Sequence, residues 1–209
     1  MRAITKGKEP ASLAEHRANP GADYEGADKD DLRFSLVTEQ RGLCCYCLSR
    51  IRPELGSMKI EHWHSQKRYP AEQLDYTNLL GACMGNEGQS PRYQHCDTHK
   101  ANRDLSRNPA NPSHRVADLI RYAPDGTIRS DDKIFDQELN SVLNLNIAVL
   151  KSNRKAVLDG FLGALPRHGD LPRSTVEKWL RDWNGDSGSG ELQPFNQVIV
   201  YWLRKRLRA

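Results

Sequence analysis

The sequence predicts an α+β fold, in which a small, loop-rich core precedes a mostly helical C-terminal region. Three observations support this prediction. All five cysteines of the 209-residue chain fall between residues 44 and 96, within one segment. Short apolar stretches separated by turn residues lie on either side of Glu61-His62, and such stretches are typical of short strands. Beyond residue 140, apolar residues recur at the spacing of helices.

Composition places the chain among globular proteins with a polar surface. Hydrophobic residues make up 37% and charged residues 28%, and the mean hydropathy is −0.75. No stretch approaches the roughly 20 apolar residues of a membrane span, and the first residues lack the apolar segment of a signal peptide. We therefore expect a cytoplasmic protein without a membrane partner. The net charge of +4 permits contact with nucleic acid but does not require it.

Changes in composition along the chain divide it into three segments. Residues 1–40 are expected to form loops around one or two short helices, the last over residues 32–40. Residues 41–107 form the predicted core. Two prolines within residues 108–112 indicate a linker, because proline interrupts regular structure. Residues 113–209 then form a mainly helical region that we expect to bind a partner.

Within the core, the expected order of elements is strand, strand, helix. A short strand, a turn over residues 53–56 and a second strand through residues 58–60 place Glu61 and His62 at a strand end. Residues 77–80 are a further short strand or turn. After an insertion loop over residues 85–93, a helix is expected near Asp97, whose carboxylate suits a helix N-terminus.

The C-terminal region is expected to contain a hairpin and three helices. Residues 122–128 resemble a hairpin with a tight Asp-Gly turn. A helix is expected from Leu143 to Phe161, ending at Pro166. Ser174 and Glu177 have the spacing of a capping box for the next helix.

The last predicted helix begins near Phe195 and ends in a basic tail. Its cations are Arg204, Lys205, Arg206 and Arg208. Cations near a helix C-terminus interact favourably with the helix dipole. We therefore favour helix stabilisation and solvation as their role over contact with nucleic acid or a partner.

Four cysteines have spacings that a structural zinc ion can use. Two ligands separated by two residues on a tight turn supply half of a tetrahedral site, and Cys44 and Cys47 fit that half. Cys83 and Cys96 supply a looser second half, and Cys45 is spare. The alternative is a set of buried apolar cysteines. Three cysteines in four positions favour zinc, bound by Cys44, Cys47, Cys83 and Cys96.

A second group of polar residues has the composition needed to hydrolyse a phosphodiester. Such a reaction needs a base to activate water and a cation to offset developing charge. His62 is the natural base, and Glu61 offers hard oxygen to Mg²⁺ or Mn²⁺. Asn78 would orient the imidazole or complete the metal shell. Asp97 and His99 are alternatives for the remaining metal ligand, and Lys100 would contact a phosphate.

These motifs resemble a known family. Glu61-His62, Asn78-Leu79-Leu80 and Cys96 followed by Lys100 resemble the H-N-H endonuclease motif in its zinc-bound ββα-metal form. The wider pattern is similar to the PtuB family of nuclease subunits, which belong to Septu and retron-associated anti-phage defence systems. The further matching positions are Cys44-x2-Cys47, Tyr76-x-Asn78-Leu79-Leu80-x2-Cys83, His95-Cys96-Asp97-x2-Lys100, and Val142 to Asn146 followed by Arg154.

The resemblance implies a divalent-metal nuclease that works with a PtuA-like ABC-class ATPase. In retron-associated systems, a reverse transcriptase and its RNA–DNA product are further implied partners. The family pattern gives His62 the role of general base, Glu61 a metal contact and Asn78 an orienting role. Two positions depart from that pattern. Asp97 stands where many H-N-H proteins have histidine, and Ser65 replaces the usual proline.

Two other hypotheses compete with a nuclease. In the first, the chain is a non-catalytic zinc-ribbon module that binds nucleic acid or protein. In the second, the region after Ser113 is a helical adaptor in which Trp179, Trp183 and Trp202 form an interface. The sequence leaves open whether the substrate is DNA or RNA.

Overall fold

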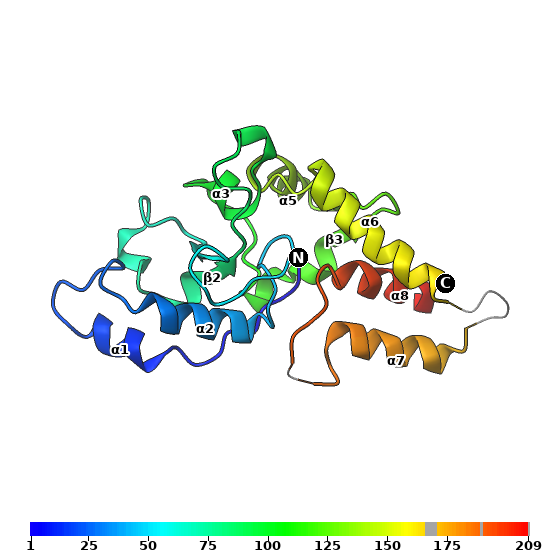
Figure 1. Ribbon diagram of the computed structural model, residues 1–209, viewed down its shortest axis with the longest axis horizontal. Helices are drawn as coiled ribbons and strands as arrows, with labels where there is room; N and C mark the ends of the chain where they lie inside the picture. Colours follow the sequence, from blue (N-terminus) through cyan, green and yellow to red (C-terminus); the bar gives the residue numbers. More distant parts are fainter. Residues whose placement is uncertain (166–170, 189, 209) are drawn as a thin grey trace.

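The computed structural model describes residues 1–165, 171–188 and 190–208. It contains helices and two small antiparallel sheets, which confirms the predicted α+β class. Figure 1 shows helices α1 and α2 at one side of the molecule and α6, α7 and α8 at the other, with the N-terminus between them. No helix in the described ranges combines the length and apolar character needed to cross a membrane.

The N-terminal segment contains the helices α1 (Ala11–Arg17) and α2 (Lys29–Glu39). Helix α2 is the helix expected over residues 32–40, but it begins three residues earlier. The carboxylate of Asp28 accepts hydrogen bonds from the backbone of Asp30 and Asp31, and so caps the helix. The cysteine-rich turn follows its last residue closely.

The core contains the strands β1 (Lys59–His62) and β2 (Leu79–Ala82), which pair antiparallel, and the helix α3 (Cys96–Lys100). Glu61 and His62 therefore end a strand, as predicted. The connecting loops contain the 3-10 turns η1 (Pro70–Glu72), η2 (Tyr76–Asn78) and η3 (Pro91–Tyr93). The strand expected before the turn at residues 53–56 is only an isolated bridge between Leu43 and Arg50.

The hairpin expected near residues 122–128 is confirmed. Strand β3 (Ile120–Tyr122) pairs antiparallel with β4 (Ile128–Ser130). Gly126 in the turn has φ +83°, and a Cβ there would lie 2.0 Å from the backbone oxygen of Lys151, so only glycine fits. The elements around the hairpin are η4 (Pro112–His114), α4 (Val116–Leu119), α5 (Lys133–Gln137) and the π-helical η5 (Glu138–Val142).

The three long C-terminal helices are α6 (Ala148–Gly163), α7 (Arg173–Asn184) and α8 (Gln197–Arg208). Helix α6 begins five residues later than predicted, because Asn144 has a left-handed φ of 51° that interrupts a helix. The predicted end of this helix at Pro166 lies outside the described residues. Phe195 has φ 57° and precedes α8 instead of starting it.

The predicted capping box at the start of α7 is wrong. Pro172 occupies the N-cap position, with no side-chain cap, and Ser174 is already inside the helix. The carboxylate of Glu177 instead accepts a hydrogen bond from Arg173 at 2.9 Å. Pro172 has a non-helical ψ of 138°, so the helix begins at Arg173, one residue ahead of the serine.

One large apolar cluster joins all three predicted segments. It contains Met1 from the first, Cys44 and Ala82 from the second, and Leu158 and Phe195 from the third. A smaller cluster packs α7 on α8 and α6. There the ring of Phe161 contacts three tryptophans edge-on, at centroid distances of 5.9, 5.8 and 5.6 Å for Trp179, Trp183 and Trp202. These tryptophans hold the helices together.

Candidate functional site

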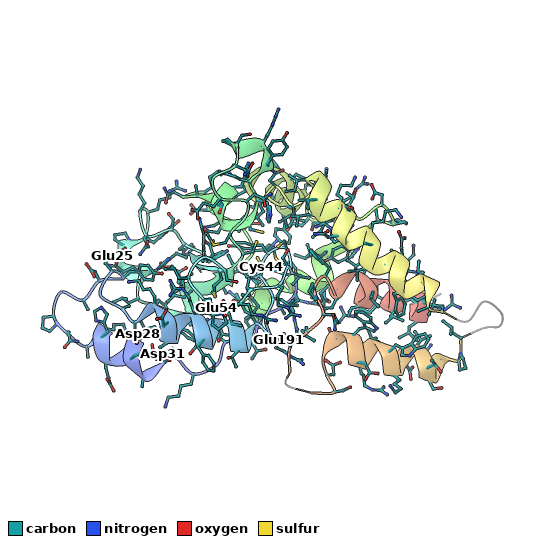
Figure 2. The ribbon with its side chains drawn as sticks, viewed as in Figure 1. Glu25, Asp28, Asp31, Cys44, Glu54 and Glu191 are labelled. Atoms are coloured by element: carbon teal, nitrogen blue, oxygen red, sulfur yellow. The ribbon has the colours of Figure 1, made fainter. Side chains whose placement is uncertain are left out.

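Four cysteines from distant parts of the core meet at one point. Cys44 and Cys47 lie on the turn after α2, Cys83 follows β2, and Cys96 begins α3. Their sulfur atoms all lie within 4.8 Å of one another. Among the described residues, this is the one group of three or more histidine, cysteine or acidic side chains that could hold a metal ion. Cys44 lies near the middle of the molecule (Figure 2).

The sulfur separations fit a tetrahedral zinc site. The Sγ atoms of Cys44 and Cys96 are 3.9 Å apart, and those of Cys47 and Cys83 are 3.7 Å apart. A disulfide requires about 2.05 Å. Zinc–sulfur bonds of about 2.3 Å in a tetrahedron separate the sulfurs by about 3.8 Å. The cluster therefore suits a metal ion such as zinc and is not a pair of disulfides.

Two neighbouring side chains complete the surroundings of the cysteine cluster. His95, to which the sequence assigned no chemical role, has Nδ1 3.2 Å from the sulfur of Cys96 and 3.9 Å from that of Cys83. An N–H donated to a ligand sulfur would stabilise a thiolate. Cys45, the spare cysteine, is buried outside the four-sulfur group, and its backbone N–H donates to Gly81.

Glu61 is buried at the end of β1, in contact with charged and polar groups. Its Oε1 accepts a hydrogen bond from the Tyr46 hydroxyl at 2.6 Å and lies 2.8 Å from Nζ of Lys100. The carboxyl group of Asp97, on α3, is near enough to act on the pKa of Glu61. Burial, followed by this second carboxyl group, raises the pKa of Glu61, and Lys100 opposes that shift. Two carboxyl groups thus converge beside a buried cation.

His62 is held by a backbone carbonyl. Its Nε2 lies 3.0 Å from the oxygen of Gln73. Because a carbonyl can only accept, Nε2 carries the proton in the neutral ring and Nδ1 keeps its lone pair. The ring of Tyr24 contacts the imidazole edge-on at 4.6 Å. Burial lowers the pKa of His62, which favours the neutral form at pH 7.

Asn78 fastens the loop that follows β1. Its Oδ1 accepts from the backbone N–H of His64 at 2.7 Å, and its Nδ2 donates to the carbonyls of His64 and Glu72 at 2.9 and 3.3 Å. From the sequence, we expect this amide to orient the His62 imidazole or to complete the metal shell. All three of its hydrogen bonds hold the backbone beyond His62 instead, so it positions the loop.

The two alternatives for the last metal ligand lie in different surroundings. The carboxyl group of Asp97 is near enough to Glu61 to raise the pKa of that residue. The Nδ1 of His99 lies 2.9 Å from the Val142 carbonyl in η5 and 3.1 Å from Nη2 of Arg103. Asp97 is therefore together with Glu61, whereas His99 ties α3 to the C-terminal region.

Lys100 does not face solvent as a phosphate contact would. Its side chain is fully buried, and Nζ donates to the His62 carbonyl at 3.0 Å as well as pairing with Glu61. The expected phosphate contact is therefore wrong, because this ammonium has its partners inside the core.

His64 is a further polar residue beside this group, and its spacing in the sequence alone indicates no role for it. Its ring stacks between Trp63 and Tyr69, at centroid distances of 4.1 and 4.2 Å. Its Nδ1 lies 2.7 Å from the carboxylate of Glu72. The alternation of aromatic and histidine residues in Glu61-His62-Trp63-His64 was the available signal.

Comparisons with protein-family models and with curated proteins each found no match to this chain.

Proposed function

We propose that this chain is a divalent-metal-dependent endonuclease of the H-N-H type, which hydrolyses phosphodiester bonds in nucleic acid. The proposal rests on one observation. The carboxyl groups of Glu61 and Asp97 are neighbours, and His62 follows Glu61 at the end of β1. A base and two hard-oxygen ligands thus occur together, as the hydrolysis of a phosphodiester requires.

His62 acts as the general base in this proposal. The Gln73 carbonyl holds Nε2, so Nδ1 takes the proton of the attacking water. The water oxygen forms a bond to phosphorus while the bond from phosphorus to the leaving oxygen breaks. Asn78 keeps the loop after β1 in place, and thereby fixes the backbone next to His62.

Glu61 and Asp97 fit a magnesium or manganese ion, because these ions prefer carboxylate oxygens. Tyr46 and Lys100 both bind Oε1 of Glu61, so its other oxygen can face a cation shared with Asp97. When bound, the ion offsets charge that develops on the phosphate and on the leaving oxygen. We assign Asp97 as the second ligand, because its carboxyl group is the one near Glu61.

The four cysteines hold this arrangement together in the proposal. The zinc ion that they would bind connects the turn after α2, the end of β2 and the start of α3. These elements carry or adjoin Glu61 and Asp97. The order of two antiparallel strands and a helix beside a cysteine cluster supports a zinc-bound ββα-metal core.

The biological setting that we propose is an ATPase-gated anti-phage defence complex. Its support is the resemblance of the motifs to the PtuB family, whose nuclease subunits act with an ABC-class ATPase. Co-expression with the product of a neighbouring ATPase gene, followed by purification through a tag on one subunit, tests this setting. A stable complex is expected, and separation of the two proteins at every step would count against it.

A cleavage assay tests the nuclease. The purified protein, with and without the ATPase, is incubated with single-stranded DNA, duplex DNA and RNA in Mg²⁺ or Mn²⁺. We expect His62→Ala to abolish cleavage while the zinc content stays that of the wild type. His16→Ala is the matched control, because its imidazole is also bonded to a backbone carbonyl, at 2.8 Å from Asp23, but on a different loop.

Retained cleavage by His62→Ala would remove His62 as the base. Binding of nucleic acid without cleavage, by the wild type with its partner and either metal, would instead favour the non-catalytic zinc-ribbon module.

A further inference from the structure

We infer that a positively charged cleft between α8 and residues 115–122 binds the phosphate backbone of nucleic acid. The cleft has a volume of about 360 Å³. Five cationic side chains and one acidic side chain, Asp118, line it. The cations are Arg115, Arg121, Arg204, Lys205 and Arg208. The excess of positive charge in this one cleft equals the net charge of +4 of the whole chain.

The cations of α8 lie on one face of the helix. Tyr201, Arg204, Lys205 and Arg208 follow the i, i+3, i+4, i+7 spacing of a single face, and all line the cleft. The opposite face carries Ile199 and Leu203, which are buried against α7. Stabilisation of the helix dipole does not require the cations to share a face. Their alignment over a concave surface indicates a ligand.

The cations of the two walls differ in how they are neutralised. Arg115 pairs with Asp118 at 2.8 Å, and Arg121 pairs with Asp131 at 2.6 Å. Within the described part of the chain, Arg204, Lys205 and Arg208 have no acidic partner within 4.0 Å. The wall formed by α8 therefore presents three charges that an anionic ligand can neutralise.

The lining of the cleft favours nucleic acid over a lipid surface. Helices that bind membranes need large apolar side chains that insert between lipids. The large apolar side chains exposed in the described ranges all lie elsewhere. The cleft instead contains Tyr122 and Tyr201, with ring centroids 6.0 Å apart, beside the cations. Cations on two walls with aromatic rings between them suit a strand that carries many phosphates and bases.

The cleft is distinct from the candidate catalytic group. It shares no residue with Glu61, His62, Asn78 or Asp97. Figure 1 shows α8 in the half of the molecule away from β2. Binding in this cleft would hold a nucleic-acid substrate at a point distant from the bond that is cut. The link to cleavage rests on the proposed function, whereas the binding itself does not.

Fluorescence anisotropy tests the inference, with fluorescein-labelled single-stranded DNA, single-stranded RNA and duplex DNA. Titrations are run over a range of KCl concentrations without added divalent cation, so that the strands stay intact. The variant carries Arg204→Gln, Lys205→Gln and Arg208→Gln together. The control is Arg206→Gln on the same helix, because Arg206 lies over the ring of Trp202, at 5.7 Å, and not in the cleft.

We expect the triple variant to bind at least about tenfold more weakly than the wild type at moderate salt. The slope of log K against log salt should become shallower by about 2 for single strands, since each lost phosphate contact removes about 0.7. Arg206→Gln should keep the wild-type affinity and slope. Thermal melting of both variants at the wild-type temperature checks that the fold is retained.

Equal affinity and equal salt slope in the triple variant and the control would overturn the inference. Binding to phosphatidylserine vesicles that is lost in the triple variant, with no binding of any oligonucleotide, would overturn it in favour of a membrane contact. Loss of oligonucleotide binding in the triple variant would support nucleic-acid binding by the cleft even if the wild type cut no substrate. In that case only the proposed nuclease activity would be rejected.

Discussion

The carboxylate of Glu61 and the ammonium of Lys100 form an ion pair of 2.8 Å in the interior, where their side chains are 3% and 0% exposed. The pair joins the end of β1 to α3. Because Lys100 also donates to the His62 carbonyl, one ammonium holds the side chain of Glu61 and the backbone of His62. The main role of this ammonium is therefore to stabilise the fold of the core.

Replacing Lys100 with methionine should destabilise the protein strongly. The substitution keeps most of the volume but leaves the Glu61 carboxylate buried without its cation. Removing one partner of a buried pair costs about 3–5 kcal/mol. Urea denaturation of the zinc-loaded protein measures the loss. The surface change Lys155→Met, which breaks a half-exposed pair with Asp159, should cost less than about 0.5 kcal/mol.

A double variant separates the loss of the ion pair from a packing defect. Adding Glu61→Gln to Lys100→Met removes the uncompensated charge, so much of the lost stability should return. If the double variant is no more stable than Lys100→Met alone, the penalty comes from packing and the buried pair has little energetic role.

The purified protein should hold one tightly bound zinc ion per chain. Because the ligands come from three separate parts of the core, loss of the ion should loosen all three and lower the melting temperature. Metal analysis by mass spectrometry is expected to show loss of zinc in Cys44→Ser and Cys96→Ser. Cys45→Ala is the matched control, since this buried cysteine lies outside the four-sulfur group. A folded wild type without metal would contradict the assignment.

The cysteine cluster could be predicted because its signal is local and chemical. Three cysteines in four positions are hard to explain by packing, and Cys44 and Cys47 already fix half of a tetrahedron. The strand end at Glu61 and His62 was also predictable from the apolar residues before it. The roles of Lys100 and His64 could not be predicted. Lys100 contacts residues that are distant in the sequence, and the aromatic stacking of His64 does not follow from the spacing of residues.

The start of α6 and the N-cap of α7 were predicted wrongly, because both depend on local backbone conformation. Leu143 and Leu145 are apolar, and they nearly continue the helical spacing of the apolar residues of α6. Both are buried, but they lie in a turn where Asn144 has a left-handed backbone conformation. The periodicity of apolar residues records burial, and burial occurs in turns as well as in helices. The capping-box prediction is wrong because α7 begins at Arg173 with Pro172 as its N-cap, so Ser174 already lies inside the helix.

Asp97 and His99 should differ sharply in cleavage. Asp97→Asn removes a carboxylate beside Glu61, so metal-dependent cleavage should fall by at least about 100-fold. His99→Ala removes a hydrogen bond to Val142 in η5 and should leave cleavage within a few-fold of the wild type. Both variants are compared at several Mn²⁺ concentrations, since a weakened metal site responds to added ion. The reverse ranking would make His99 the ligand.

Alkaline pH should destabilise the protein through its buried tyrosines. Burial raises the pKa of Tyr24 to about 12, and burial together with Glu39 raises that of Tyr76. An unfolded tyrosine loses its proton near pH 10. Above about pH 10, the unfolded chain therefore binds fewer protons than the folded one, and stability must fall as pH rises. Below that pH, both states keep the phenol protons, and the tyrosine contribution to stability is complete.

Tyrosine-to-phenylalanine variants identify the groups responsible for this pH dependence. Tyr76→Phe removes one phenol that resists ionisation in the fold, so the free energy of unfolding should fall less steeply between about pH 9.5 and 11.5. The variant also loses the 2.9 Å hydrogen bond to Glu39, which lowers stability at every pH without changing that slope. Tyr93→Phe is the control, because Tyr93 is 49% exposed. Urea denaturation at each pH gives the slopes, and equal slopes in the wild type and Tyr76→Phe would assign the alkaline loss to other groups.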